Sequence, residues 1–579
     1  PLGAVTVLKN LQVEYQTNPL GIDVSQPRFN WQMESDRYGA CGQAYRLWVA
    51  DSPEQLAAGR YIYDSGKVLS GESVGVVYQG KALQPSTRYY WKVSVWDESG
   101  TEITSTEPAW FETGLLGSGW SGARWIGSSE TQLSKYRSHY VIDYDVRVAE
   151  GNDKAAFVFG ARDADNYVSA ELDLNGSGDA RFILRHTTDG KTTQDASESL
   201  ASIIPASDKH KAHHIRLKVT TAQYALKYFV DIEIDGKTLV NSSLTPEEKE
   251  RKSRGDFWGG KEGAFTVYPY PDGELVYHCR LYAIGFLQPK GQTATFSNLR
   301  ISEDTWNTLL YNPAETYVEK GEGKLNVWYP GENVSAPMLR KTIKIEKPVK
   351  SARLYATARG VYEFSVNGQK VGKDYLNPGW TDYRYRIMYN TYDITDLLRP
   401  GDNGIGAMLG AGWWSEHSGF LTGWQDQYGT RQSLLGKIVI EYADGTRETI
   451  VTNDSWKCYD RGPITFNGLQ NGEEYDARKE VNGWDAPGFD DSSWKPATLF
   501  AAPPVNVEIQ GYVGSPIQNN VTLTAQSMVE PIPGVYVYDM GQNMVGVPRL
   551  TFKGKAGQEI TIRFGEMNYP ETVSYTHLR

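Results

Sequence analysis

The stretch RYYWKVSVWD (88–97) alternates between residues that suit a buried face and residues that suit water. Because successive side chains of a β-strand point to opposite faces, this period of two predicts a strand that is buried on one side. The same alternation recurs in AYRLWVA (44–50), HHIRLKV (213–219) and GVYEFSVNG (360–368), with Gly, Pro, Asn or Asp around them. The pattern predicts an all-β chain.

The clearest helical signal is short and polar. Thr245 and Glu248 have the spacing of a capping box, Pro246 stands at the first helical position, and Gly255 marks the end. No apolar stripe follows, so the sequence predicts one solvated turn of helix.

The composition is that of a folded protein with several domains. At 579 residues the chain is too long for one core and predicts about three to five domains. Its 37 Tyr and 17 Trp suit β-sandwich cores and also make flat platforms for sugar rings. The net charge of −11 argues against a nucleic-acid partner. No apolar run is long enough to cross a membrane. The three cysteines lie far apart, so each is expected to be a small buried residue.

Clusters of expected strands divide the chain into a string of β-sandwich domains. The expected order is a fibronectin type III-like sandwich (1–116), a linker (117–128), a lectin-like or concanavalin-like sandwich (129–303), a linker (304–337), a jelly-roll-like sandwich (338–502) and the start of a further β-domain (503–579). In the last domain, VYDMGQNMVGVPRL (537–550) predicts a strand, a tight turn and a second strand.

Two familiar catalytic or metal-binding patterns are excluded by their context. GESVG (71–75) matches a nucleophile elbow, but a strand follows it where the elbow requires a helix. His213 and His214 are neighbours on an expected strand, so they face opposite ways and cannot share a metal. The loops 417–430 and 467–478 are rich in aromatic, amide and acidic residues, which fits either sugar-facing loops or polar loops that cap a sandwich.

Two oxygen-rich turns in the second domain are candidates for calcium binding. ARDADNY (161–167) ends an expected strand with Asp163, Asp165 and Asn166, and hard oxygen ligands of this kind suit Ca²⁺. DLNGSGD (173–179) offers similar side chains but lacks the closing Glu of an EF-hand. Asn-Gly with Ser-Gly is also good hairpin chemistry, so a plain turn is the favoured interpretation there.

Three separated blocks resemble the bacterial α-L-rhamnosidases of glycoside hydrolase family 78. The resemblance rests on NPLGID (18–23), YYWKVSVWDESG (89–100), FETGLL (111–116), ARLYATARGVYEFSVNGQKVG (352–372), LNPGWTDYRYRIMYNTYDITDLL (376–398), AMLGAGWW (407–414), WDAPGFDDSSW (484–494) and YDMGQNMVG (538–546). Together the blocks cover roughly 375 residues, in the order in which the family carries these β-domains.

The resemblance also suggests a role for the second domain. Some family members carry at this place a calcium-dependent rhamnose-binding module of carbohydrate-binding family 67. FGARDADNY (159–167) is similar to the loop in which that module holds Ca²⁺ and sugar, and Asp165 and Asn166 match its ligand pair. The sequence departs from the module because no Trp follows soon after the loop. Sugar binding is therefore a hypothesis, and a laminin-G-like or concanavalin-like packing module is the default interpretation.

The resemblance implies an enzyme whose catalytic residues we do not find in this sequence. The family places its general acid and base in a helical (α/α)₆ barrel that follows the β-domains, and no counterpart of that barrel is found here. We therefore expect the N-terminal accessory portion of an inverting α-L-rhamnosidase that acts on rhamnose-containing carbohydrate, secreted, periplasmic or on a bacterial cell surface. We assign no catalytic residue and expect this chain to be inactive alone. A stand-alone carbohydrate-binding or adhesion protein is the alternative.

Overall fold

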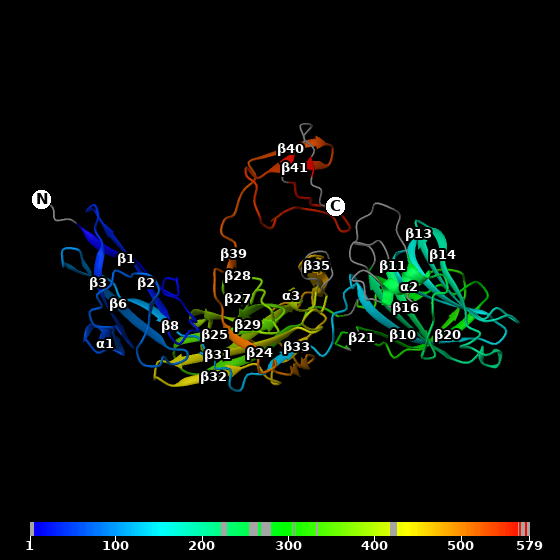
Figure 1. Cartoon of the computed structure of the whole chain (residues 1–579), viewed down its shortest axis with the longest axis horizontal. Coiled ribbons are helices and arrows are strands. Elements are labelled where there is room, and N and C mark those ends of the chain that lie inside the picture. Colours follow the sequence, from blue (N-terminus) through cyan, green and yellow to red (C-terminus); the bar gives the residue numbers. More distant parts are fainter. Residues whose placement is uncertain are drawn as a thin grey trace. The chain divides into compact units, whose positions relative to one another are not determined.

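The computed structural model of the chain consists almost entirely of β-strands (Figure 1). It describes residues 5–117, 119–221, 228–253, 265–267, 280–303, 305–306, 308–331, 334–416, 425–565, 567–568 and 574–575. The α-helices of this part are α1 (Pro53–Ala57), α2 (Pro246–Ser253) and α3 (Gly412–Ser415), with 3-10 turns at Ala206–Asp208, Thr395–Leu397 and Ala477–Lys479. The all-β prediction is confirmed. None of the helices in these ranges has the length and hydropathy of a membrane span.

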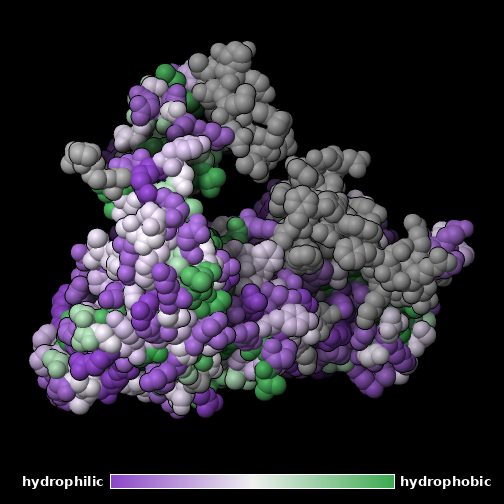
Figure 2. Space-filling model, turned by 60° about the vertical axis from the view of Figure 1, so that its left-hand side comes forward, coloured by the Kyte–Doolittle hydropathy of each residue, from purple (hydrophilic) through white to green (hydrophobic). Residues whose placement is uncertain are grey.

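The described residues form two compact units. The first comprises Pro1–Gly372 with Leu376–Val513, and the second comprises Lys373–Tyr375 with Gly514–Arg579. The surface visible in Figure 2 is mostly hydrophilic, with small apolar patches between polar residues, as expected for a folded protein with separate cores.

The first sandwich has two sheets around an aromatic core. The sheets are β1 (Thr6–Val13)–β2 (Arg28–Ser35)–β5 (Val76–Val77) and β4 (Tyr63–Asp64)–β3 (Gly42–Ala50)–β6 (Arg88–Asp97)–β7 (Glu102–Thr104), with β8 (Ala109–Glu112) beside β6. The alternation in β6 works as predicted, because Tyr89, Trp91, Val93 and Val95 are all buried. Trp91 packs edge-on against Phe29 of the facing sheet, with ring centroids 4.8 Å apart.

The second sandwich has an eight-stranded and a six-stranded sheet. The first contains β17 (Lys237–Thr238), β16 (Tyr228–Ile234), β15 (His213–Thr221), β10 (His139–Val148), β20 (Thr293–Ser302), β21 (Leu309–Tyr311), β18 (Phe265–Val267) and β22 (Tyr317–Lys320). The second contains β14 (Lys191–Ser199), β13 (Arg181–Thr188), β12 (Asn166–Asp173), β11 (Lys154–Asp163), β19 (Ala283–Phe286) and β23 (Asn326–Trp328). Strands β21, β22 and β23 come from the segment 304–337, which we expected to be a linker. They are too short to show a clear period of two, and only their pairing partners place them in this sandwich.

The third sandwich recruits strands from outside its expected range. One sheet contains β27 (Gln369–Lys370), β26 (Val361–Val366), β30 (Gly401–Gly410), β24 (Met338–Ile345), β33 (Lys457–Tyr459) and β36 (Lys495–Pro496). The other contains β37 (Thr498–Phe500), β9 (Trp125–Gly127), β31 (Ser433–Tyr442), β25 (Val349–Arg359), β29 (Arg386–Asp393), β38 (Glu508–Gly511) and β32 (Arg447–Val451). β9 lies in the expected linker 117–128, and β38 lies beyond residue 502. β34 (Ile464–Gly468) and β35 (Gly472–Tyr475) pair as a separate two-stranded sheet.

Strand β25 is buried on both faces. Leu354 and Ala356 point into the core of the third sandwich, whereas Arg353 and Tyr355 point the other way and are also buried. Tyr355 packs there with Leu115 from the end of the first sandwich. The first sandwich is therefore seated on the outer face of this sheet.

The second unit consists of short strand pairs: β28 (Asp374–Tyr375) with β39 (Ile517–Gln518), β40 (Ser527–Ile532) with β41 (Val535–Asp539), and β42 (Met567–Asn568) with β43 (Ser574–Tyr575). The turn between β40 and β41 contains Gly534 at φ +83°, a conformation that favours glycine. The first strand predicted in 537–550 is confirmed by the end of β41, but residues 542–550 form no second strand.

Candidate functional site

The predicted pair Asp165 and Asn166 lies at the turn between β11 and β12. Asp163 Oδ1 accepts hydrogen bonds from the backbone N–H of Asp165 (2.9 Å) and from the side-chain amide of Asn166 (2.7 Å). Burial opposes ionisation of Asp163, but these hydrogen bonds outweigh it and hold the pKa of that carboxyl below its ordinary value. The turn is thus fixed by the first carboxylate of the motif.

A second turn contacts the same residues. Asn166 is buried, and its Oδ1 accepts a hydrogen bond from the backbone N–H of Asp189 (3.1 Å), in the turn between β13 and β14. The backbone N–H of Gly190 donates to the carbonyl of Asp165 (3.0 Å). The Asp165 carboxylate is exposed. The amide of Asn166 therefore ties two hairpins together while Asp165 faces solvent.

These residues fit calcium only in part. Ca²⁺ takes about six to eight oxygen ligands, and here Asp165 supplies an exposed carboxylate and Asn166 an amide oxygen with one lone pair already used. Within the described ranges, no three His, Cys, Asp or Glu side chains converge as a metal site. Calcium and sugar binding by Asp165 and Asn166 stay a prediction.

The other oxygen-rich turn, 173–179, is organised by a lysine. Lys209 is buried, and its ammonium donates to the carbonyls of Leu174 (2.8 Å), Gly176 (2.8 Å) and Gly178. Three converging carbonyl oxygens can bind a cation, and here the cation is the Lys209 ammonium, a compact charge with three hydrogen-bond donors. A lysine some 30 residues away along the chain gives no sequence signal for this contact, since only its tertiary neighbours reveal the role.

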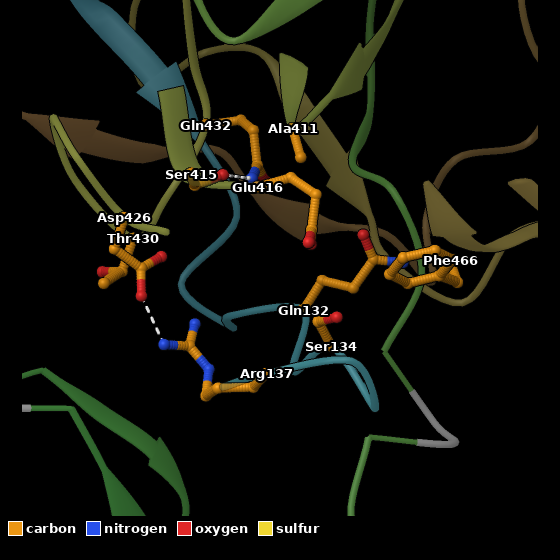
Figure 3. Close-up of a pocket in the computed structure, with 10 residues that line it drawn as sticks. All are labelled: Gln132, Ser134, Arg137, Ala411, Ser415, Glu416, Asp426, Thr430, Gln432 and Phe466. Atoms are coloured by element: carbon orange, nitrogen blue, oxygen red, sulfur yellow. Dashed lines mark hydrogen bonds and ion pairs between the residues drawn. The ribbon is translucent and has the colours of Figure 1, made fainter. Parts of the chain in front are cut away.

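A small cavity lies where the second sandwich meets the third. We call it the junction cavity (Figure 3). It is lined by Gln132, Ser134, Arg137, Ala411, Ser415, Glu416, Asp426, Thr430, Gln432 and Phe466. Its volume of about 10 Å³ has room for roughly one water molecule and not for a sugar ring.

The junction cavity contains a buried ion pair between the two sandwiches. The Arg137 guanidinium contacts the Asp426 carboxylate, and both side chains are almost fully buried. Burial raises the pKa of Asp426 to about 6; Arg137 opposes this shift, whereas Glu416 and Glu303 add to it. The indole of Trp306 donates to the Asp426 carbonyl (2.7 Å), which fixes this loop to the second sandwich.

Two polar atoms in the junction cavity are left without partners. Across the described ranges, neither Asp426 Oδ1 nor Arg137 Nε finds a hydrogen-bond partner. Figure 3 shows the Glu416 carboxylate directed into the same space. A water molecule in this space could accept from the Arg137 Nε–H or donate to Asp426 Oδ1. The cavity is therefore suited to joining two domains and not to binding substrate.

The loops that looked sugar-facing in the sequence lie at this junction. Asn467 donates to Gln132 Oε1 (3.0 Å), and its own Oδ1 accepts from the backbone N–H of Ala411 (2.6 Å). Asp426 and Thr430 line the cavity. The part of the first loop at 417–424 lies outside the described residues.

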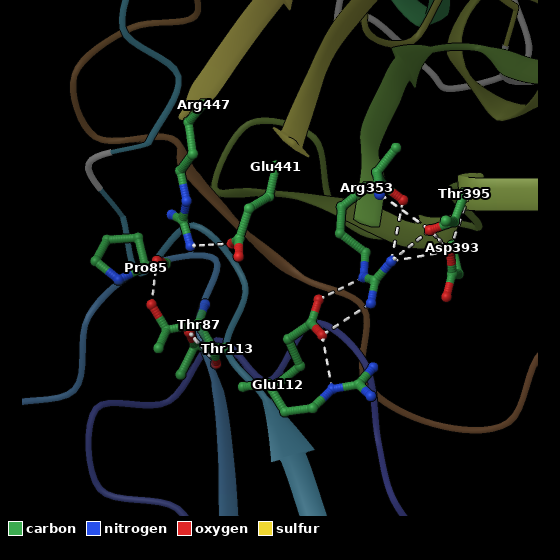
Figure 4. A network of polar contacts seen from close by, with 11 residues as sticks. Pro85, Thr87, Glu112, Thr113, Arg353, Asp393, Thr395, Glu441 and Arg447 are labelled. Carbon is green, nitrogen blue, oxygen red and sulfur yellow. Dashed lines mark hydrogen bonds and ion pairs between the residues drawn. The ribbon is translucent and has the colours of Figure 1, made fainter. Parts of the chain in front are cut away.

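A second polar network joins the first sandwich to the third (Figure 4). Glu112, almost fully buried, accepts from Arg353 Nε (2.6 Å) and Nη2 (3.2 Å) and from Arg88 Nε (3.1 Å). Arg353 also contacts Asp393 (2.8 Å). Nearby, the Tyr389 hydroxyl donates to Asp23 (2.7 Å) and accepts from the backbone N–H of Leu115 (2.6 Å). The sequence singled out none of these residues as partners, because the Arg353–Glu112 and Tyr389–Asp23 contacts join residues of different sandwiches.

The cysteines differ from expectation at one position. Cys458 is buried, as predicted, but Cys41 is exposed. Cys279 lies outside the described residues.

Comparison with known protein families assigns three parts of the chain. Residues 8–117 match the model of a Rha78A-like, N-terminal immunoglobulin domain, residues 347–518 that of an alpha-L-rhamnosidase N-terminal domain, and residues 530–579 that of a bacterial alpha-L-rhamnosidase concanavalin-like domain. The first match agrees with the expected sandwich, because immunoglobulin and fibronectin domains share this architecture.

Individual relatives match over almost the whole chain. An alpha-L-rhamnosidase of Streptomyces avermitilis is 33% identical over 600 residues, which is 97% of this chain and 51% of the relative. The crystal structure of the Streptomyces avermitilis enzyme complexed with L-rhamnose has a TM-score of 0.61 at 29% identity, covering 99% of this chain and 52% of that one. The Dictyoglumus thermophilum alpha-L-rhamnosidase has a TM-score of 0.53 at 26% identity, covering 93% and 38%. The chain thus spans about half the length, or less, of these relatives.

Proposed function

Because the chain carries the N-terminal domains of the bacterial α-L-rhamnosidases of glycoside hydrolase family 78, we propose that it is the accessory part of an enzyme that releases terminal α-L-rhamnose. The observation that carries this proposal is continuity: one rhamnosidase relative matches all three sandwiches and the second unit in a single alignment. The substrates we propose are rhamnose-bearing plant polysaccharides or glycosides. An enzyme meets a plant polysaccharide outside the cytoplasm. We therefore also propose that this protein is secreted, to the periplasm or to the cell surface.

We assign the chemistry to residues outside the described ones. Inverting hydrolysis needs two carboxylates about 6.5–9.5 Å apart, with space for a water between them and a sugar bound beside them. Glu416 and Asp426 share the junction cavity, but it has no room for a sugar. The three sandwiches in this proposal form the scaffold of the enzyme. The buried pair Arg137–Asp426 links the second to the third, and the buried pair Arg353–Glu112 links the first to the third.

The test is hydrolysis of p-nitrophenyl α-L-rhamnoside. We expect turnover by the product of the whole reading frame that encodes these residues and none by the purified 579-residue chain. Turnover by the chain alone would refute the assignment of the chemistry. No turnover by the whole product, together with binding of rhamnose, would favour the stand-alone carbohydrate-binding protein.

We further propose that the second sandwich binds rhamnose with the help of Ca²⁺ at Asp165 and Asn166. The support is the position of both residues in one ordered turn, with the Asp165 carboxylate facing solvent. We expect L-rhamnose to bind the chain in calorimetry with Ca²⁺, and to fail with EDTA or in Asp165→Ala. Asp179→Ala, in the neighbouring turn, is the matched control and should bind like the unchanged chain. Rhamnose binding that survives both EDTA and Asp165→Ala would contradict this site.

A further inference from the structure

Two tryptophan rings lie parallel on the third sandwich. The rings of Trp380 and Trp413 have centroids 6.3 Å apart and an interplanar angle of 5°. Trp380 is 47% exposed, whereas Trp456 and Trp494 of the same sandwich are 2% and 5% exposed. Trp413, in α3, is half-buried. We call Trp380 and Trp413 the aromatic platform.

Buried neighbours fix the segment that carries Trp380. Asn377 is buried, and its amide donates to the Tyr392 hydroxyl (2.7 Å). The Tyr383 hydroxyl donates to the carbonyl of Gly379 (2.7 Å). The Tyr383 ring is buried edge-on against Trp414, with centroids 5.6 Å apart. These contacts fix the chain on both sides of Trp380, so little of this segment has to become ordered when a ligand binds, as in pre-organised binding surfaces.

Polar groups follow the exposed ring in the chain. Asp382 and Arg384 form a two-pronged pair, with hydrogen bonds of 2.8 and 2.7 Å. Tyr385 is 64% exposed. A carboxylate, a guanidinium and a phenol in the same segment as Trp380 can each hydrogen-bond to the hydroxyl groups of a ligand.

This combination fits a sugar ring. A pyranose carries C–H groups on its faces and hydroxyls around its edge, so it pairs an aromatic face with polar groups beside it. Trp456 is enclosed by the sandwich, whereas Trp380 leaves part of its ring open to solvent, where a ligand can reach it. The opposite charges of Asp382 and Arg384 cancel, which favours a neutral ligand over an anion.

We propose that the aromatic platform binds a pyranose residue of a rhamnose-bearing polysaccharide, apart from the turn at Asp165 and without calcium. This inference rests on the proposed function, because that function supplies the polymer. The platform would hold the chain of a polysaccharide to the third sandwich while another part of the enzyme acts on it.

The experiment is affinity electrophoresis of the 579-residue chain in native gels that contain rhamnogalacturonan I, with EDTA present throughout. We expect the unchanged chain to be retarded. Trp380→Ala should weaken the apparent affinity about tenfold, the change expected for losing one stacked ring. Trp380→Phe, which keeps a smaller ring and protects the fold, should weaken it about threefold. Tyr38→Ala removes a fully exposed aromatic from the first sandwich and should leave the retardation unchanged.

The other outcomes separate the aromatic platform from the proposed function. No retardation of the unchanged chain, or equal retardation of both Trp380 variants and the unchanged chain, overturns the platform. If the whole reading frame still hydrolyses p-nitrophenyl α-L-rhamnoside in that case, the proposed function stands without the platform. If retardation depends on Trp380 but the product of the whole reading frame shows no hydrolysis, the platform is supported and the proposed rhamnosidase function is rejected.

Discussion

Replacing Asp426 by Asn tests whether the junction cavity holds a proton. In the folded chain the pKa of Asp426 is raised from 3.8 to about 6, first by burial and then by Glu416 and Glu303, although Arg137 opposes the shift. The folded state therefore binds this proton more tightly than the unfolded state. The stability that results is fully present below the unfolded pKa and is lost as the pH rises through the folded pKa.

The size of the effect follows from the two pKa values. At about pH 5 the proton on Asp426 adds roughly 1 kcal/mol to the free energy of unfolding, and at about pH 4 it adds roughly 2 kcal/mol. Near pH 8 it adds almost nothing, because Asp426 is ionised in both states. The amide introduced by Asp426→Asn cannot titrate. The free energy of unfolding of the unchanged chain minus that of this variant should therefore fall by roughly 1 kcal/mol from about pH 5 to about pH 8.

The measurement is urea unfolding followed by tryptophan fluorescence at a series of pH values. Subtracting the variant from the unchanged chain removes the titration of all other groups, provided they do not change. The matched control is Asp444→Asn in the exposed turn after β31. The pKa of Asp444 is lowered to about 2, first by the Thr446 side chain, so that difference should stay flat. A flat or rising difference for Asp426→Asn would show that Arg137 keeps the carboxylate ionised and would refute the reasoning.

Three further substitutions test contacts that only the fold brings together. Lys209→Met removes the ammonium from three carbonyls and should lower the free energy of unfolding of the second sandwich by about 1–3 kcal/mol, measured by urea unfolding; equal stability would contradict the cation role. Glu112→Gln removes the negative charge that faces the buried Arg353 guanidinium, so the free energy of unfolding should fall by about 2–4 kcal/mol. Proteolysis between the first and third sandwiches should also become faster, and an unchanged cleavage rate would disprove this. Tyr389→Phe loses the hydroxyl that donates to Asp23 and should lower the melting temperature through a loss of about 1–2 kcal/mol; a melting curve identical to that of the unchanged chain would show that the contact adds nothing.

Local features were predictable from the sequence where they depend on nearby residues. The capping box is formed as expected: Thr245 Oγ1 accepts from the backbone N–H of Glu248 (3.2 Å), and the Glu248 side chain accepts from the backbone N–H of Thr245 (2.9 Å). His213 is buried against Asp235 while His214 faces solvent and contacts Asp145, as the period of two requires. Both outcomes follow from geometry within one element.

Domain limits were less predictable, because short strands carry little pattern. β9 has three residues, and its place is decided by pairing with β31 and β37 of the third sandwich, far away in the sequence. β21, β22 and β23 likewise join the second sandwich through β20 and β19. A strand of about three or four residues shows at most about two periods, so composition alone could not separate it from a linker.

The fold class and the resemblance to rhamnosidase β-domains could be predicted from the sequence, because they depend on repeated strand patterns and on motifs that are local in the chain. Which polar residues matter could be seen only once the chain was folded. The Arg137–Asp426 pair, the Lys209 ammonium on its three carbonyls and the parallel rings of Trp380 and Trp413 each join residues that are distant in sequence. The energy of a charge or an exposed ring depends on what lies around it in space, and for this chain those surroundings come from other strands and other sandwiches.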